Sequence, residues 1–269
     1  MKEKTGFTLV ELSIVLVIIG LIVGGVLVGQ DLINAAKIRS QISQMEKYQT
    51  AVNTFKLKYG YLPGDIPDPT ASAFGFTARG TNAGQGDGNG LIEGTYSGAP
   101  DSNWGLIVEA GETAIFWTDL AAANLLDGGS FTSASIICPP GCWGVFTGNL
   151  GDYFPTGKIG NGNFISVYSD SNKNYFEISI ITAILGNSQI TANTGLSPIQ
   201  AYAIDNKLDD GLPQSGRITA NYVNTWFVQW SANAAAASTT TCFDTTSGNY
   251  SVGQNGGNGI NCALSFKLQ

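Results

Sequence analysis

The sequence contains no histidine among its 269 residues. Histidine-based catalytic triads, histidine general bases and the usual zinc sites with imidazole ligands are therefore excluded. Charged residues are also scarce, at 12% of the chain, and they sum to a formal net charge of −7. No basic cluster marks a surface for nucleic acid, so we expect no direct nucleic-acid partner. Because no nucleophile stands paired with a base, we predict that the protein is not an enzyme.

What the sequence does contain is a long apolar run close to its start. The nineteen residues from Leu12 to Gln30 carry no charge, and most of them are Ile, Val, Leu or Gly. A helix of this length, at about 1.5 Å per residue, just spans the ~30 Å hydrocarbon layer of a bilayer. A secretory signal peptide would carry a small-residue cleavage site behind such a run, and none follows Val28. The run is therefore predicted to stay in the mature protein as a membrane helix.

The residues in front of the run form a short basic leader that ends in glycine. Lys2 and Lys4 precede Gly6, and Phe7 opens the apolar helix. This arrangement resembles the class III signal of type IV pilins and type II secretion pseudopilins, and the resemblance is close over about the first 60 residues. It implies that a prepilin peptidase removes residues 1–6 by cutting after Gly6. It also implies that the peptidase methylates the new amino terminus at Phe7.

Glu11 is the one acid at the start of the apolar run, where an isolated carboxylate is costly in lipid. The resemblance implies an intermolecular role, in which this carboxylate pairs with the Phe7 amine of a neighbouring subunit and sets the axial step of a filament. A local role also fits, because Thr8 and Glu11 have the spacing of a capping box at a helix start. The two roles can hold at different stages, and we expect the intermolecular one to govern assembly.

Four glycines punctuate the predicted membrane helix. Gly20 with Gly24, and Gly25 with Gly29, have the small-xxx-small spacing that lets two helices approach closely in lipid. We therefore expect these glycines to pack against another helix. Glycine is also simply frequent in membrane helices, and that alternative stays open.

The helical pattern continues beyond the membrane segment as one apolar stripe at steps of three and four residues. We predict one helix from about Phe7 to Tyr59, roughly 80 Å long at 1.5 Å per residue. Residues 7–30 would form its membrane and assembly half, and residues 31–60 would pack on the head. Gly60 would end it. The stripe consists of Leu32, Ala35, Ile38, Ile42, Met45, Val52, Phe55 and Tyr59.

Residues 61–269 predict a globular head that mixes helices and strands. Glu112–Leu126 has the pattern of an amphipathic helix, and Ser197 caps a second helix that runs to Leu208. We predict an α+β fold: a long helical stem, transmembrane in its first half, packed on a mostly antiparallel β head, as in pilins. The predicted strands span residues 164–169, 175–181, 217–220 and 225–230, with the first two forming a hairpin.

The chain has four cysteines, Cys138, Cys142, Cys242 and Cys262. An even count beyond a membrane segment indicates two disulfides in an oxidising compartment. Three pairings exist, and we favour the sequence neighbours, Cys138 with Cys142 and Cys242 with Cys262. The second bond would close a loop of about twenty residues and contribute ~3 kcal/mol to stability. Four reduced cysteines or a metal site are the alternatives.

Calcium is the one cofactor that the sequence suggests, although the predicted function requires none. Asp205, Asp209 and Asp210 bring three carboxylates to the end of a predicted helix, where repulsion and the helix dipole disfavour unpaired acids. A hard cation would relieve this, and the resemblance adds that some secretion pseudopilins bind calcium in their heads. A solvated helix end, with Lys207 and Arg217 as counter-charges, explains the same residues.

Two other oxygen-rich segments are interpreted as turns. The glycine-rich loop 86–90, followed by Glu93, offers oxygen ligands, but glycine turns explain its composition equally well. Residues 170–174 begin like an EF-hand loop, but Tyr175 stands where such a loop needs glycine. We therefore predict a hairpin turn there.

The aromatic and acidic residues of the head give only weak indications of a ligand or catalytic site. The five tryptophans could include a sugar-binding platform, but core packing explains most of them better. Glu109 and Glu112 could form a glycosidase pair, yet their spacing in a short segment fits a helix start. The tryptophans are Trp104, Trp117, Trp143, Trp226 and Trp230.

Taken with the residues, the resemblance implies a subunit of a type IV pilus-like or type II secretion pseudopilus filament. Such a subunit would wait in the bacterial inner membrane as a single-pass protein, with its N-terminus in the cytoplasm and its head outside. Its partners would be the prepilin peptidase, like or related pilin subunits, an inner-membrane assembly platform and membrane lipid. The alternative is a membrane-anchored minor pilin or adhesin whose head binds a surface or a glycan. A tethered hydrolase has no catalytic residues to support it.

Overall fold

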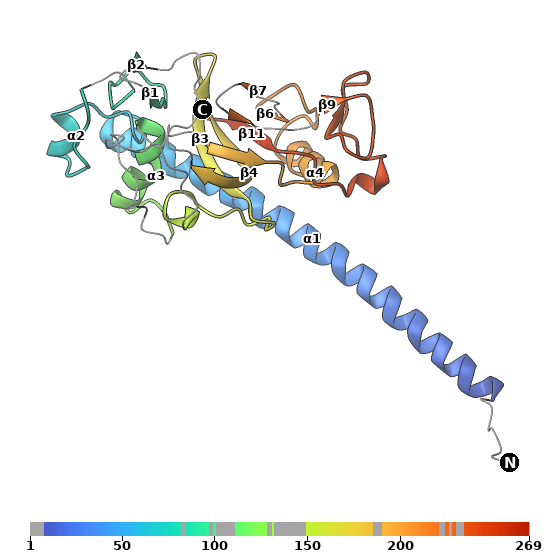
Figure 1. Ribbon diagram of the computed structural model, residues 1–269. Helices are drawn as coiled ribbons and strands as arrows, with labels where there is room; N and C mark the ends of the chain where they lie inside the picture. The colour runs from blue at the N-terminus through green and yellow to red at the C-terminus, as the bar shows by residue number, and fades with distance from the viewer. Residues whose placement is uncertain are drawn as a thin grey trace.

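The computed structural model shows one long helix that projects from a head of helices and strands (Figure 1). The structure describes residues 8–81, 84–96, 99–100, 111–127, 131, 149–184, 190–220, 224–225, 228–229 and 234–268. The long helix is α1, Leu9–Tyr59, and its C-terminal half enters the head. The described part of the chain also contains α2 (Thr70–Ala73), α3 (Glu112–Ala122), α4 (Pro198–Leu208) and the 3-10 turns η1 (Leu150–Asp152) and η2 (Asn255–Gly257).

A sheet built on the long strand β4, Lys173–Ile184, forms the centre of the head. Strand β3, Phe164–Asp170, pairs with the first part of β4 as an antiparallel hairpin. Strands β11 (Leu264–Lys267) and β5 (Ile190–Asn193) also pair antiparallel with β4, and the path through the sheet is β6–β11–β4–β5–β8–β7. The short strands are β1 (Thr95–Tyr96), β2 (Ala99–Pro100), β6 (Ile218–Thr219), β7 (Asn224–Thr225), β8 (Val228–Gln229), β9 (Ala234–Ala235) and β10 (Phe243–Asp244).

The predicted α+β architecture is confirmed, with a long apolar helix followed by a mostly antiparallel head. The end of α1 is also as predicted. Gly60 adopts a φ of 82°, and its N–H donates to the carbonyl of Lys56 at 2.8 Å. Glycine takes this left-handed conformation without the steric cost that a Cβ would add, so the helix stops there.

An aromatic cluster joins α1, α3 and the sheet. Trp117 of α3 is fully buried and stacks on Phe176 of β4, with ring centroids 5.9 Å apart. Tyr48 of α1 meets the same indole edge-on at 5.0 Å, and Phe116 does so at 5.1 Å. Aromatic pairs of this kind add about 0.5–1.5 kcal/mol beyond the area that they bury. The cluster therefore fixes the C-terminal half of α1 to the head.

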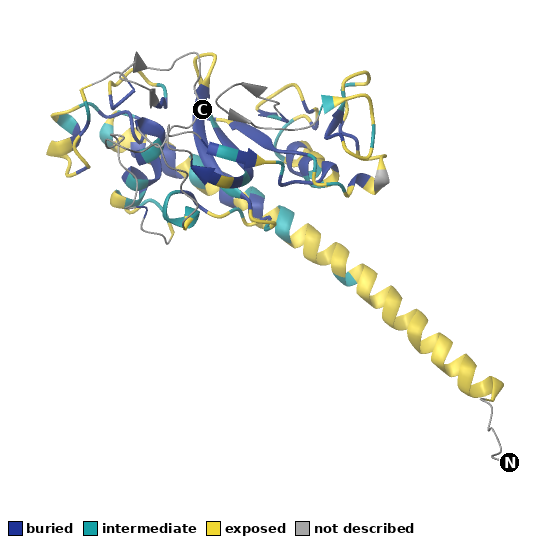
Figure 2. Ribbon diagram, in the orientation of Figure 1, coloured by how far each residue is buried: buried dark blue, intermediate teal, exposed yellow. Residues whose placement is uncertain are grey.

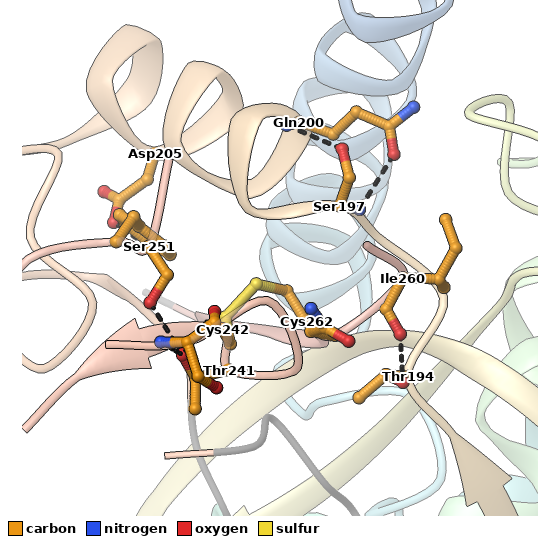
Figure 3. The surroundings of a disulfide bond; sticks show 12 residues. Thr194, Ser197, Gln200, Asp205, Thr241, Cys242, Ser251, Ile260 and Cys262 are labelled. Carbon is orange, nitrogen blue, oxygen red and sulfur yellow. Dashed lines mark hydrogen bonds between the residues drawn. A yellow bond between two sulfur atoms is a disulfide. The ribbon is translucent and has the colours of Figure 1, made fainter. Parts of the chain in front are cut away.

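Helix α4 begins with the predicted capping box. Ser197 Oγ accepts from the Gln200 N–H at 3.3 Å, and Gln200 Oε1 accepts from the Ser197 N–H at 3.0 Å (Figure 3). The disulfide between Cys242 and Cys262 lies beside this helix start, because Leu196 and Cys262 exchange backbone hydrogen bonds. This predicted pair is confirmed, and Cys138 with Cys142 lies outside the described residues.

The helix predicted to run from Glu112 to Leu126 is shorter than expected. It ends at Ala122, and Asn124 takes a φ of 56°. Asparagine tolerates this left-handed conformation better than other side chains, so it reverses the chain where the apolar pattern alone would continue the helix.

The prediction of a single strand at residues 225–230 is wrong. Two short strands, β7 and β8, pair antiparallel there, with Thr225 opposite Val228. The predicted strand at 217–220 is present as β6 but only two residues long. Strand β11, which lies between β6 and β4, was not predicted, because its four residues follow a long polar segment.

Candidate functional site

The first half of α1 stands clear of the head and presents apolar side chains on every side (Figure 2). From Leu9 to Ala36 every residue is exposed except the half-buried Gly29. A Leu or Ile side chain contributes about 1.5–3 kcal/mol when fully buried, so this surface in water would forgo roughly tens of kcal/mol. The large apolar residues are at least 50% exposed and comprise Leu9, Val10, Leu12, Ile14, Val15, Leu16, Val17, Ile18, Ile19, Leu21, Ile22, Val23, Val26, Leu27, Val28, Leu32 and Ile33.

By length and composition, α1 is able to cross a membrane, and it is the one such helix in the described part of the chain. The most apolar window of this helix has no residue buried inside the molecule. It therefore differs from the core helix of a soluble domain, whose apolar residues are covered by its own chain. An apolar surface of this size indicates a membrane or a protein partner.

From Lys37 onward the same helix turns one face to the head. Two glutamines hold it there: Gln41 Oε1 accepts from the Ile159 N–H, and Gln44 Oε1 from the Lys158 N–H, each at 2.9 Å. Of the predicted stripe, the residues from Ile38 onward are buried or pack against the core, while Leu32 and Ala35 are exposed. The buried residues of this face are Gln41, Gln44, Met45, Ala51, Val52 and Phe55.

The four glycines of the exposed half have no structural role within the chain. A Cβ placed on any of them would meet no atom within 4 Å, and none has a positive φ. Glycine nonetheless costs about 0.8–1 kcal/mol in a helix relative to alanine. The reason for glycine here therefore lies outside the fold of the single chain. The four are Gly20, Gly24, Gly25 and Gly29.

At the start of α1, Thr8 and Glu11 form the predicted capping box. Glu11 Oε2 accepts from both the N–H and the hydroxyl of Thr8 at 2.8 Å, and the Glu11 N–H donates to Thr8 Oγ1 at 3.3 Å. The local role of the carboxylate is thus present in the single chain. Gly6 and Phe7, the predicted processing residues, lie outside the described residues.

The structure brings the three predicted calcium ligands together. One oxygen each of Asp205, Asp209 and Asp210 lies within 4.8 Å of the others. Asp205 is fully buried, and both of its oxygens have donors: the Gly211 N–H at 3.2 Å and the Tyr250 hydroxyl at 2.7 Å. Burial raises the pKa of Asp205 to about 6, against the lowering effect of these hydrogen bonds.

A second acidic cluster was missed by the sequence reasoning. Asp65, Asp87 and Glu112 also place one oxygen each within 4.8 Å of one another, although they come from three separate segments. Burial, together with the charge of neighbouring carboxylates, raises the pKa of Asp65 to about 7 and that of Glu112 to about 9. Glu112 does begin α3, as predicted, but its side chain points into this cluster: its Oε1 accepts from the Gly86 N–H at 2.9 Å. The loop 86–90 was noted for its oxygens, and no spacing rule linked it to the other two acids.

Of the residues considered for a sugar-binding platform or a glycosidase pair, the structure describes the side chains of Trp117 and Glu112. Trp117 is fully buried in the core, as predicted for most of the tryptophans. The other four tryptophans and Glu109 lie outside the residues whose side chains are described. A glycan platform is therefore not built from Trp117.

Comparison with known proteins adds evidence for the start of the chain. Residues 1–27 match the family model described as the prokaryotic N-terminal methylation motif. Neither the curated proteins nor the solved structures give a match. The matched residues end within the exposed half of α1, so the match concerns the stem. The chain therefore carries the N-terminal methylation motif that is characteristic of type IV pilins and pseudopilins.

Proposed function

We propose that this chain is a structural subunit of a type IV pilus-like or type II secretion pseudopilus filament. A prepilin peptidase would cut between Gly6 and Phe7, and the exposed half of α1 would then join a bundle of the same half from other subunits. The single observation that carries this proposal is the apolar surface of residues 9–36, which belongs to a helix that is rigidly docked in the head at its other end. The matched motif supports the same reading.

In the proposed function, the exposed half of α1 is covered first by lipid and later by other subunits. Before assembly, lipid would cover the apolar side chains of residues 9–36, with the head on the outer side of the inner membrane. After assembly, other stems would replace the lipid, at little cost in apolar burial because lipid and packed Leu or Ile are similarly apolar. Gly20, Gly24, Gly25 and Gly29 would let the stems approach closely.

Glu11 would change partners during assembly. Among the described residues of the single chain, its charge is offset only by hydrogen bonds from Thr8. In a low-dielectric bundle, an uncompensated carboxylate would be strongly attracted to a free amine such as that of Phe7 in a neighbouring subunit. This pairing would set the axial step, and it requires that the leader has been removed.

Processing is tested by the intact mass of the protein from the membrane fraction. We expect a chain that begins at Phe7 and carries one added methyl group on its amine. The variant Gly6→Leu should retain Met1, because the peptidase requires a small residue before the cut. An intact wild-type chain with Met1 at its start would contradict the assigned processing.

Assembly is tested by separating the two roles of Glu11. The variant Glu11→Gln keeps a side chain that serves in a capping box but removes the charge. Thr8→Val removes the capping hydroxyl and keeps the charge. We expect sheared filaments to be lost from Glu11→Gln and kept in Thr8→Val, with both chains still in the membrane. Asp31→Asn, an exposed acid farther along the stem, is the matched control and should assemble normally. Normal filaments from Glu11→Gln would show that the carboxylate is only a local cap.

The same filament preparation distinguishes a major subunit from a minor pilin or adhesin. Quantitative mass spectrometry of purified filaments gives the number of copies of this chain relative to other subunits. Many copies per filament would support the structural role. A few copies per filament would instead support the rare subunit whose head binds a surface or a glycan.

A further inference from the structure

The acidic cluster of Asp65, Asp87 and Glu112 lies in the head, away from the exposed half of α1. Asp65 follows the turn at the end of α1, Asp87 belongs to the glycine-rich loop, and Glu112 is the first residue of α3. One oxygen from each residue lies within 4.8 Å of the other two. Three carboxylates from three distant segments therefore converge on one point.

One oxygen of Asp65, a member of this cluster, has no hydrogen-bond donor among the described residues. Asp65 is 1% exposed, and its Oδ2 accepts from the Gly90 N–H at 3.0 Å, but its Oδ1 has no donor in the described part of the chain. A buried carboxylate oxygen that has lost water and gained no donor costs free energy. A bound cation would stabilise both the oxygen that lacks a donor and the three carboxylates that lie close together.

A nearby pair shows how the fold compensates a buried acid when it uses its own residues. Asp119 is 1% exposed, and its Oδ2 accepts from the Arg79 guanidinium at 2.6 Å and from the Gly64 N–H at 2.7 Å. Its Oδ1, like that of Asp65, has no donor among the described residues, so the two acids differ in the paired guanidinium. Neither of the two ion pairs found among the described residues involves the cluster. Asp65 and Glu112 are therefore buried acids that form no ion pair with a cationic side chain among the described residues.

The geometry of the cluster fits one hard cation. Ca²⁺ lies 2.3–2.6 Å from its oxygen ligands, so two ligands of one ion are at most about 5 Å apart. Each side chain already accepts backbone N–H groups, as Glu112 Oε2 does from Glu93 at 3.0 Å and Asp87 Oδ2 does from Gly84 at 3.2 Å. A carboxylate oxygen has two lone pairs, so these bonds orient the ligands and leave room for an ion.

We propose that Asp65, Asp87 and Glu112 bind a divalent cation in the head, and that Ca²⁺ is the ion that fits best. The ligands are all oxygen, and the chain has no histidine, so a softer metal lacks its preferred donors. Mg²⁺ demands a stricter octahedron at about 2.1 Å, which a loop with several glycines constrains less well. The bound ion would tie the end of α1 to the glycine-rich loop and to the start of α3. This inference does not depend on the proposed filament function.

The cluster of Asp205, Asp209 and Asp210 provides a matched control, because its buried acid is satisfied within the protein. Both oxygens of Asp205 have donors, and Asp210 accepts from the Leu212 N–H at 2.9 Å and the Ser215 hydroxyl at 2.6 Å. Removing a charge from this control cluster should leave the proposed site of Asp65, Asp87 and Glu112 unchanged.

The test uses the full chain, purified in detergent and freed of divalent ions with a chelator. Isothermal titration with CaCl₂ should show one ion bound per chain, with MgCl₂ at least tenfold weaker. Asp87→Asn changes an exposed residue, so it should fold normally, and we expect it to weaken Ca²⁺ binding at least tenfold. Asp210→Asn should bind Ca²⁺ within twofold of the wild type. The proposal is overturned by absence of binding at millimolar CaCl₂, by unchanged binding in Asp87→Asn, or by loss of binding in Asp210→Asn.

Thermal unfolding gives a second readout at the buried ligand. Wild-type chain should unfold several degrees higher in CaCl₂ than in chelator, because an ion that binds only the folded state stabilises it. Asp65→Asn should lose this calcium-dependent shift while unfolding cooperatively in chelator. A variant that fails to fold is replaced by Asp65→Ser, and a full calcium shift in either folded variant contradicts the assignment of Asp65.

Discussion

The two halves of α1 share one uninterrupted backbone and differ completely in what covers their side chains. Residues 9–36 are exposed and, as far as Gly29, almost entirely apolar around the whole helix, whereas residues 37–59 are apolar on one face and bury that face in the head. The apolar stripe of an amphipathic helix can be buried within a single chain, because one head is enough to cover one face of the helix. An apolar surface on all sides requires lipid or several neighbours. The change of pattern along the helix therefore separates the half that the head covers from the half that other stems would cover in the proposed filament.

The largest expected effect tests the head half. Phe55 is fully buried, and Phe55→Ala should lower the free energy of unfolding of the head by about 3–5 kcal/mol, because it leaves a cavity in the core. Leu57, two residues away and 89% exposed, is the matched control. Chemical denaturation of the detergent-purified chain measures both. Equal losses at the two positions would break the distinction between the buried face and the exposed face.

The next effect tests the stem half. An acid at the centre of a membrane helix costs about 2.5–3.5 kcal/mol of insertion free energy, so Ile18→Asp should reduce the fraction of the chain in the membrane and abolish filaments. The head should unfold as in the wild type, since Ile18 lies in the exposed half of α1. Leu57→Asp carries the same charge on the head half and should leave membrane insertion unchanged. Membrane fractionation followed by thermal unfolding of the head reports both quantities, and a destabilised head in Ile18→Asp would contradict the separation.

A smaller effect sharpens the comparison through pH. Glu177 of β4 is buried, and burial raises its pKa well above the ordinary value of 4.5, although its Oε2 accepts from the Ser265 hydroxyl at 2.5 Å. The Tyr168 hydroxyl contacts the same Ser265 Oγ at 2.7 Å. The folded chain therefore keeps a proton that the unfolded chain loses above pH 4.5. Stability from this group is complete at low pH and falls as pH rises toward the folded pKa, by up to about 1.4 kcal/mol per pH unit.

Glu177→Gln removes this titration and keeps the shape of the side chain. We expect the loss of stability between pH 5 and pH 8 to be smaller in the variant than in the wild type. Urea unfolding at the two pH values measures it. Asp65, Glu112 and Asp205 also titrate, so the difference between the two proteins is the informative quantity. An identical slope would mean that Glu177 is ionised in the folded head.

The smallest expected effect concerns the stem glycines. Gly24→Ala should raise helix propensity by about 0.8–1 kcal/mol and therefore favours the isolated helix. If the glycine serves close packing between stems, assembly should nevertheless decrease, by a modest factor in filament yield. Ser13→Ala, another small exposed change in the same half, is the control. More filaments from Gly24→Ala would show that Gly24 is present only because glycine is common in membrane helices.

Local signals in the sequence predicted the parts of the fold that depend on neighbouring residues. The capping boxes at Thr8 and Ser197, the stop at Gly60 and the β3–β4 hairpin all follow from residues a few positions apart. The Cys242–Cys262 disulfide also joins sequence neighbours, at a separation of 20 residues. The apolar run likewise indicated the exposed stem, because about nineteen uncharged, mostly apolar residues have the length of a membrane-spanning helix.

Long-range pairing was not predictable in the same way. Strand β11 pairs with β4 across nearly ninety residues, and its four residues carry no turn signal that fixes the partner. The metal-binding hypothesis shows the same limit. Three acids within six residues of one another drew attention to Asp205, while the convergence of Asp65, Asp87 and Glu112 depends on how α1, the glycine-rich loop and α3 pack. The missing donor at Asp65 Oδ1 likewise depends on the folded structure and could not be predicted from the sequence.

The central claim is that copies of the stem, or related stems, cover residues 9–36 in the working protein. A photo-crosslinking amino acid placed at position 18, in cells that make the filament, tests it most directly, with position 57 as the exposed control on the head half. We predict that irradiation at position 18 gives a ladder of covalent multimers joined stem to stem, with far less from position 57. Only monomers and lipid adducts from position 18, in cells where the chain is fully processed, would contradict the claim.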